Sequence, residues 1–275
     1  MSKYFLFIFL LIFYYYFMKT LILYAFHQLS ESVDYFIKNG LFEHPDYHFI
    51  FICNSLIPIP NLVLPPYVAI VYRMNLGYDF GAWSDVLLEN NLYEQYDQFF
   101  FLNSTVIGPF IPNYCTKKWT DIYLDQLTED IRLFGLSING QGLTREQPMT
   151  SSRFPHVQSM VFCMKKSTLE YLISRNIFCK ISTNDKVRII EQHEIRMSIE
   201  IIRNGWNFGC MLEYYRGIDF RNLDSIFQKP LLDDTCYFNN LLGHPMHPYE
   251  TIFIKVNRYL DSSYLNNYKK IERIQ

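Results

Sequence analysis

The chain has 275 residues, of which 49% are hydrophobic, so it is long enough to bury a sizeable core and too apolar for a disordered or fibrous protein. Its 25 basic and 27 acidic residues give a formal charge of −2 without a long run of one sign, so nucleic acid is not an expected partner. The six cysteines form no C-x-x-C pair, and Cys53 and Cys163 lie in apolar, strand-like runs. We therefore expect buried free thiols rather than disulfides or a zinc site.

The N-terminal residues 4–18 carry no charge and consist only of aliphatic, aromatic and methionine side chains. As a helix this segment is about 22 Å long at 1.5 Å per residue, short of the roughly 30 Å of bilayer hydrocarbon. Lys3 and Lys19 flank it evenly, so charge does not decide which side of a membrane the chain faces. We predict that residues 1–18 are a retained signal anchor and that the protein is membrane-associated. The alternative is a hydrophobic helix packed on the domain.

Beyond Lys19, short apolar runs alternate with polar stretches of helical character. The apolar runs predict strands at 21–26, 48–55, 67–75, 98–105, 131–139, 157–165 and 206–215. The polar stretches predict helices at 31–39, 167–176 and 191–205. This alternation predicts an α/β fold with a mainly parallel central sheet flanked by helices, in a single compact domain over residues 19–261. Residues 262–275 are predicted to form a polar C-terminal tail, either loose or helical.

Polar side chains follow three of the predicted strands, at residues 54–55, 75–81 and 103–105. In open α/β sheets a ligand binds beyond the carboxyl ends of the strands, where loops meet helix N-termini. Gly77 and Gly81 allow the backbone to approach a nucleotide or to turn with positive φ, and Asp79 can accept hydrogen bonds from a ribose or a base. The spacing N-x-G-x-D-x-G is neither a Walker loop nor the dinucleotide fingerprint. A capped helix entry, with Asp79 satisfying backbone donors, is therefore the alternative.

Five stretches, taken in order, resemble the motifs of a glycosyltransferase-like family related to the rhamnan synthesis F proteins. They are NLGYDFGAW, YDQFFFLNSTVIGPFIP, HVQSMVF, QHEIRMS and HPYETIFIKVNR. The resemblance covers most of residues 20–258. It implies a GT-A fold, a nucleotide-sugar donor and transfer of a sugar to a glycan or another hydroxyl acceptor. It also implies a donor nucleotide site made of Asn75, Gly77, Tyr78, Asp79 and Gly81.

By the same resemblance, the FLNST segment stands where many GT-A enzymes hold a metal with an Asp-x-Asp motif. Asn103 and Ser104 are expected to contact the donor there, but with Thr105 they offer only neutral oxygens, whereas Mg²⁺ or Mn²⁺ usually needs a carboxylate beside the diphosphate. Two alternatives stay open. Either the phosphates supply most metal ligands, with Asp79 or His156 helping, or side chains and helix dipoles neutralise the leaving group. The sequon formed by Asn103 to Thr105 is interpreted as accidental, because an inner strand end is poorly accessible.

The second half of the chain supplies the catalytic candidates. His156, with Gln158 beside it, opens a predicted strand where contacts to the acceptor or the donor sugar are expected, although a structural histidine is the alternative. Glu194 is the candidate general base, because sugar transfer needs the acceptor hydroxyl deprotonated as the anomeric carbon gains oxocarbenium character. Glu191 and Glu200 are the controls for this assignment, because a glutamate of this stretch can also belong to a solvated helix face. The i, i+3 offset of Glu191 and Glu194 predicts that these two lie on one helix face.

A proline-flanked segment, GHPMHPYE, contains two further histidines, His244 and His247. The prolines predict a rigid turn, and no cysteine or carboxylate stands at ligand spacing. We therefore do not expect a metal site in this segment. Tyr249 and Glu250 are expected to close the site from its C-terminal side.

Three hypotheses follow. The first is a membrane-associated GT-A glycosyltransferase that transfers a hexosyl or deoxyhexosyl group from a nucleoside-diphosphate sugar to a glycan or glycoprotein acceptor. The second is a catalytically degenerate member that binds glycan, nucleotide or a protein partner, which the missing carboxylates in FLNST motivate. The third is an unrelated membrane-tethered scaffold, for which no cavity should exist at residues 54, 75–81 and 103.

Overall fold

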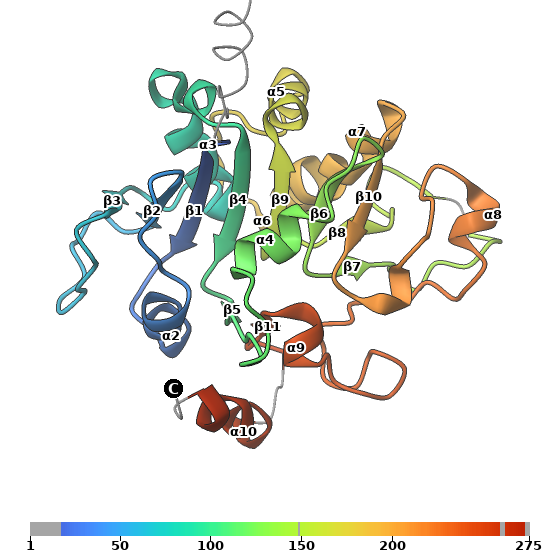
Figure 1. Ribbon diagram of the computed structural model, residues 1–275. Coiled ribbons are helices and arrows are strands. Elements are labelled where there is room, and N and C mark those ends of the chain that lie inside the picture. Colours follow the sequence, from blue (N-terminus) through green and yellow to red (C-terminus); the bar gives the residue numbers. More distant parts are fainter. Residues whose placement is uncertain (1–17, 148, 259–261, 273–275) are drawn as a thin grey trace, which may run out of the picture.

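The computed structural model describes residues 18–147, 149–258 and 262–272 (Figure 1). The predicted membrane anchor at 1–18 lies outside these ranges, except for its last residue. Within them, no helix is both long enough and apolar enough to cross a bilayer.

A seven-stranded sheet lies at the centre of the domain. Its strands follow in the order β10 (Asn207–Cys210), β6 (Ile131–Gly135), β9 (Val161–Lys165), β4 (Gln98–Asn103), β1 (Thr20–Phe26), β2 (Tyr47–Cys53) and β3 (Val68–Tyr72). The pairs β1–β2, β1–β4, β2–β3 and β6–β10 are parallel, whereas β9 runs antiparallel to its neighbours β4 and β6. The predicted α/β fold with a mainly parallel central sheet is thus confirmed.

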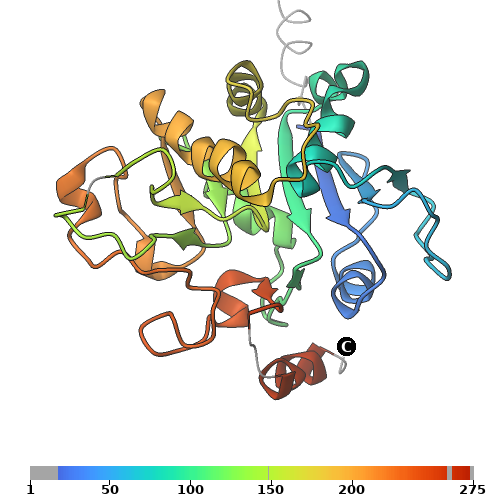
Figure 2. The same ribbon diagram turned by 180° about the vertical axis from the view of Figure 1, so that it is seen from behind.

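Helices cover both faces of this sheet (Figure 1 and Figure 2). The helix α4 (Trp119–Leu124) lies in front of the sheet in Figure 1, and α3 (Tyr78–Leu88) and α7 (Arg196–Arg203) come to the front in Figure 2. Because both faces are covered, the central strands are apolar throughout rather than alternating, and every residue of β1 and β4 is buried.

Shorter elements complete the described part of the chain. Its other helices are α2 (Glu31–Asn39), α5 (Lys166–Ser174), α6 (Lys186–Ile189), α8 (Leu223–Ile226), α9 (Pro248–Thr251) and α10 (Ser262–Glu272). The 3₁₀ helices η1 (Glu89–Gln95) and η3 (Glu213–Tyr215) and the π-helix η2 (Ile190–Ile195) join them. Two small antiparallel pairs lie outside the main sheet, namely β5 (Val106–Ile107) with β11 (Ile254–Lys255), and β7 (Ile138–Asn139) with β8 (His156–Val157).

The predicted strands at 131–139 and 157–165 are each interrupted in the structure. The strand predicted at 131–139 ends at Gly135. An added Cβ at this position would lie 2.3 Å from Val157 Cγ1, so only a glycine allows the backbone here to lie this close to the Val157 side chain. The chain then leaves the main sheet, and β7 pairs with β8 instead. This interruption places His156 and the residues after it at the edge of the sheet where β1 and β4 end, because β9 runs antiparallel to β4.

Aromatic packing fixes α3 to the sheet. The Trp83 ring lies edge-on to the rings of Phe101 and Phe162, with centroid distances of 5.5 Å to each, and these two phenylalanines stack on one another at 4.6 Å. Aromatic pairs in these geometries stabilise a fold by about 0.5–1.5 kcal/mol each beyond the area they bury. The N-terminal turn of α3, which carries Asp79, is therefore held in a fixed position over β4 and β9.

All six cysteines are free thiols, as predicted. Four are buried, whereas Cys115 and Cys179 are partly exposed. Burial raises the pKa of Cys210 to about 12, so this thiol stays protonated at neutral pH.

The C-terminal residues 262–272 form the helix α10, which packs on the domain. Lys269 of α10 forms an ion pair with Glu31 of α2, and the Tyr268 hydroxyl lies 3.0 Å from Nε2 of His247. Of the two alternatives for the tail, the helical one therefore holds for these residues.

Glu200 of α7 is fully buried and anchors three arginines. Its carboxylate accepts hydrogen bonds from Arg175 and Arg203 at 2.9 Å and from Arg196 at 3.4 Å. Burial alone raises the pKa of this carboxyl, but the Arg175 and Arg203 guanidinium groups lower it more, and the net shift is downward. Glu200 thus joins α7 to the end of α5 as a charged structural group.

We expect Glu200→Gln to lower the free energy of unfolding by about 2 kcal/mol, because charged hydrogen bonds to a buried group are lost. The measurement is chemical denaturation of the wild-type protein and the variant at pH 7. Glu191→Gln, in the π-helix η2 that precedes α7, is the matched control and should change stability by less than about 0.5 kcal/mol. Equal losses in both variants would contradict a specific structural role for Glu200.

Candidate functional site

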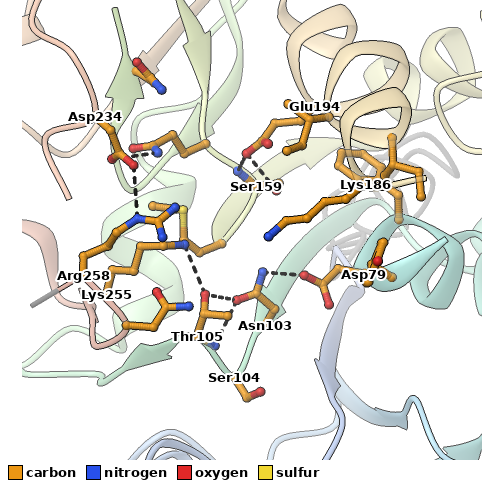
Figure 3. Close-up of a pocket in the computed structure, with 18 of the residues that line it drawn as sticks. Asp79, Asn103, Ser104, Thr105, Ser159, Lys186, Glu194, Asp234, Lys255 and Arg258 are labelled. Atoms are coloured by element: carbon orange, nitrogen blue, oxygen red, sulfur yellow. Dashed lines mark hydrogen bonds and ion pairs between the residues drawn. The ribbon is translucent and has the colours of Figure 1, made fainter. Parts of the chain in front are cut away.

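A cavity of about 470 Å³ opens at the carboxyl ends of the parallel strands (Figure 3). Its walls include His27 after β1, Asn54 after β2, Asn75 after β3 and Asn103 at the end of β4. The volume lies within the range of about 300–1,000 Å³ that is typical of small-molecule sites. Polar residues from the three predicted strand ends, Asn54, Asn75 and Asn103, therefore meet around one space, and His27 after β1 joins them.

The residues predicted for the donor site divide into two groups. Asn75, Tyr78, Asp79, Asn103 and Ser104 line the cavity, whereas Gly77 and Gly81 do not.

The two glycines shape the turn that carries the lining residues. Gly77 has a φ of +74°, and its amide N–H donates to Thr183 O and to Asn184 Oδ1. At Gly81 an added Cβ would lie 2.0 Å from the Leu76 carbonyl oxygen. Both positions thus require glycine for local backbone packing.

A buried arginine, Arg73, fixes the ends of β2 and β3, and sequence reasoning did not single it out. Its guanidinium group donates to Asn54 Oδ1 at 2.6 Å, to Asp85 Oδ2 at 2.8 Å and to the Leu76 carbonyl at 2.8 Å. These contacts join the two strand ends to the loop before α3 and to α3 itself. Arg73 is therefore a positioning residue for the cavity wall.

Asp79 and Asn103 are in direct contact. The Asn103 side chain donates from Nδ2 to Asp79 Oδ2 at 2.8 Å, while its Oδ1 accepts from the Thr105 amide N–H at 3.1 Å and from the Thr105 hydroxyl. The pKa of Asp79 is raised to about 6, chiefly by burial and to a smaller extent by nearby Glu194, whereas the Asn103 hydrogen bond, Lys255 and Lys186 oppose the shift. This carboxyl therefore changes charge close to neutral pH.

Asn75 has an unsatisfied side-chain oxygen beside the cavity. Its Oδ1 is buried and has no hydrogen-bond partner among the described residues. A buried acceptor without a donor is unfavourable by roughly 1–3 kcal/mol. Asn75 is thus suited to accept a hydrogen bond from a bound ligand.

Glu194, the candidate general base, lines the cavity, whereas its two controls Glu191 and Glu200 do not. Its Oε1 accepts from the Ser159 amide N–H at 2.7 Å and from the Ser159 hydroxyl at 2.9 Å, and its Oε2 has no hydrogen-bond partner among the described residues. Glu191 instead lines a separate hollow, and Glu200 is buried in its arginine cluster. The prediction that Glu191 and Glu194 share one face is wrong, because both lie in the π-helix η2, whose turn is wider than that of an α-helix.

His156 is buried and lines the cavity. Its Nδ1 lies 2.7 Å from the Phe154 carbonyl oxygen, which can only accept, so Nδ1 carries the proton and the neutral ring has its lone pair on Nε2. Gln158 also lines the cavity and donates to Asp234 Oδ1 at 3.0 Å. His156 and Gln158 thus both line the cavity, and their contacts to the acceptor or the donor sugar stay a prediction.

Sequence reasoning missed four charged residues of the cavity, namely Lys186, Asp234, Lys255 and Arg258. The Lys255 ammonium group donates to the Thr105 hydroxyl at 3.4 Å, and Arg258 pairs with Asp234 at 3.4 Å. Lys186 has no hydrogen-bond or ion-pair partner among the described residues and points into the cavity (Figure 3). Lys255 and Arg258 stood in the HPYETIFIKVNR motif, but nothing local to that motif shows that it reaches β4.

The C-terminal motif lines the cavity with Lys255 and Arg258 rather than with the expected Tyr249 and Glu250. His247 caps α9, with Nδ1 accepting from the Tyr249 amide at 3.2 Å and Nε2 next to Tyr268, so its ring nitrogens are engaged. Glu250 accepts from the Glu213 amide N–H at 2.9 Å. Tyr249 and Glu250, which were expected to close the site, do not line the cavity.

The described residues do not fit a divalent metal site at the end of β4. They include no group of three or more His, Cys, Asp and Glu side chains that could hold a metal. The Asn103 oxygen already accepts two hydrogen bonds, and the Thr105 hydroxyl is in contact with an ammonium group. Mg²⁺ and Mn²⁺ need carboxylate and other free oxygen ligands.

Comparison with known proteins gives the family. The family model of rhamnan synthesis protein F matches residues 49–243, which is more than half of the chain. The chain belongs to the rhamnan synthesis protein F family. This confirms the resemblance found in the sequence and connects the protein with glycan biosynthesis in a glycosyltransferase-related role. No curated protein matches the chain.

The part matched by the rhamnan synthesis protein F family contains much of the cavity wall. It includes the residues that follow β2, β3 and β4, together with His156, Glu194 and Asp234. His27, Lys255 and Arg258 lie outside the matched range. The cavity is therefore assembled from the family region and from segments on either side of it.

We expect Asp79→Asn to stabilise the folded protein at neutral pH. The folded-state pKa of about 6 lies above the ordinary carboxyl value of 3.8, so the folded state holds the proton more tightly and stability falls as pH rises from about 4 to about 6. The variant removes this unfavourable ionisation and should gain about 2–3 kcal/mol at pH 7.5.

Denaturation at pH 4 and pH 7.5 measures this gain, which should be close to zero at the lower pH. Asp125→Asn, at an exposed carboxylate, is the control and should show no such pH-dependent gain. A gain for Asp79→Asn of the same size at both pH values would show that the charge of Asp79 is not its cause.

Proposed function

We propose that the protein is a GT-A type glycosyltransferase that transfers a sugar from a nucleoside-diphosphate sugar to a hydroxyl group of a glycan acceptor. The observation that carries the proposal is the place of the cavity in the sheet. In the order β3-β2-β1-β4 the parallel strands β2 and β3 are added on one side of β1 and β4 on the other, and open α/β sheets bind nucleotides in the crevice at such a switch point. His27 after β1 and Asn103 of β4 both line the cavity.

The wall near β3 and α3 offers groups suited to the nucleoside. The Asn75 oxygen lacks a donor, and the Asp79 carboxyl can accept hydrogen bonds from ribose hydroxyls or a base. Ser104 and the phenol of Tyr78 lie beside them. Donor recognition on this side would satisfy the Asn75 oxygen, which the protein alone leaves unpaired.

The opposite wall offers a base. Glu194 is held through one oxygen by Ser159, which leaves its Oε2 available to a substrate hydroxyl. In an inverting transfer the acceptor oxygen bonds to the anomeric carbon, the bond from that carbon to the phosphate oxygen breaks, and Glu194 takes the acceptor proton. His156, with a free Nε2 when neutral, can accept a hydrogen bond from the transferred sugar or the acceptor.

We expect Glu194→Gln to slow sugar transfer by about 10²–10⁴-fold, because the amide cannot take the acceptor proton, while donor affinity stays within about threefold. The measurement combines calorimetric titration of UDP-, GDP- and dTDP-sugars with release of nucleoside diphosphate in the presence of acceptor glycans. Glu191→Gln is the matched control, since Glu191 lies on the same π-helix outside the cavity, and should leave both quantities unchanged.

The same titrations separate the alternatives. Donor binding without turnover in the wild-type protein would favour a family member that binds nucleotide or glycan without catalysis. No binding of any of the three donors would count against the proposed transferase altogether.

A further inference from the structure

The side chains at the end of β4 have their polar groups already engaged within the protein. Asn103 donates to Asp79 and accepts twice from Thr105, and the Thr105 hydroxyl in turn contacts the Lys255 ammonium group at 3.4 Å. This segment stands where the donor's diphosphate is expected in the proposed transferase. The positive charge present at that position is therefore a lysine of the chain itself.

Backbone pairing fixes the position of Lys255. The strand β11 pairs antiparallel with β5, with Lys255 opposite Val106, and the Val256 amide N–H donates to the Thr105 carbonyl at 3.0 Å. The Lys255 side chain thus starts from an ordered strand directly beside the end of β4. A charge held in this way is preorganised, so it need not be reoriented when an anion binds.

A second ammonium group enters the cavity from the other side. Lys186, the first residue of α6, points into the space between Glu194 and the Asp79–Asn103 pair (Figure 3). It has no hydrogen-bond or ion-pair partner among the described residues, although it is close enough to Asp79 to favour the ionised carboxylate. Arg258, by contrast, is paired with Asp234. Lys186 and Lys255 are thus the cavity cations without a carboxylate partner in direct contact, within the part of the chain that is described.

We propose that Lys255, assisted by Lys186, takes the role that a divalent metal has in other enzymes of this type, so that the donor's diphosphate is bound and the leaving group stabilised without a metal. This inference rests on the proposed transferase function. As the bond between the anomeric carbon and the phosphate oxygen breaks, its electron pair stays on that oxygen, and the departing nucleoside diphosphate gains one negative charge. The two ammonium groups are placed to stabilise this charge, while the acceptor proton goes to Glu194.

A dication in the same place would meet electrostatic repulsion. Like charges a few ångströms apart in a partly buried site repel strongly, and Lys255 is already in contact with the Thr105 hydroxyl. Burial also raises the pKa of Asp79 to about 6, so this carboxyl ionises less readily than an ordinary carboxylate ligand of a metal. Both features favour binding of a phosphate anion by ammonium groups over coordination of a cation.

The test is calorimetric binding of UDP, GDP and dTDP to the full chain, first with EDTA and then with Mn²⁺ or Mg²⁺. At least one nucleoside diphosphate should bind, and its Kd in EDTA should lie within about twofold of its Kd with metal. Lys255→Met should weaken binding of that nucleotide in EDTA by about tenfold to hundredfold, which is the range for a lost charged hydrogen bond. Added Mn²⁺ should not restore it.

Two further variants distinguish the loss of the Lys255 charge from misfolding as the cause of weak binding. Lys255→Arg keeps the positive charge and should remain within about fivefold of the wild-type Kd. Lys180→Met, at an exposed lysine that lines a different hollow, should bind as the wild-type protein does. Weak binding by Lys255→Met together with normal binding by Lys255→Arg assigns the effect to the charge rather than to misfolding.

The results that overturn the inference differ from those that overturn the proposed function. Binding that requires Mn²⁺ or Mg²⁺, or an unchanged Kd for Lys255→Met in EDTA, would reject the role of Lys255 and leave a nucleotide-binding transferase in place. No binding of any nucleoside diphosphate, with or without metal, would reject both.

Discussion

The hydrogen bond between Asn103 and Asp79 is the contact on which the cavity depends. It joins the end of β4 to the first turn of α3, two segments that chain topology alone places only near one another. The carboxyl that it holds is buried enough for its pKa to rise to about 6, which is unfavourable for the folded state at neutral pH. A buried carboxyl that lowers the stability of the folded state and lines a cavity is typical of binding and catalytic sites, where function often lowers stability.

The charged residues of the cavity have two different proposed functions, binding of the diphosphate and deprotonation of the acceptor. Lys255 lies at the end of β4, where a diphosphate would be held, and Lys186 points into the same cavity, whereas Glu194 is fixed by Ser159. Ammonium groups and a base that line one cavity suit a displacement in which a leaving group departs from a sugar carbon as a nucleophile attacks it. The cavity geometry and the family membership therefore support the same class of reaction.

The sequence predicted what depends on local pattern. Apolar runs located the strands, and the polar residues after them, such as Asp79 and Asn103, were placed together because parallel strands end at one edge. The turn with positive φ, one of the two roles predicted for Gly77 and Gly81, is present at Gly77, but the close contacts with Ile181 and Leu76 that also require these glycines are made only in the folded chain. The i, i+3 spacing of Glu191 and Glu194 was interpreted with α-helical geometry, whereas the structure has a π-helix there. Lys255 reaches Thr105 across 150 positions of sequence, a pairing that no local signal contains.

The central claim is that the side chains at the ends of β1, β3 and β4 hold an activated sugar nucleotide. A crystal structure with the intact nucleotide sugar bound tests it most directly. The account predicts the diphosphate between Lys186 and Lys255, the nucleoside beside Asn75 and Asp79, and the anomeric carbon facing Glu194. Density for the nucleotide in another hollow, or a diphosphate out of reach of both lysines, would contradict it.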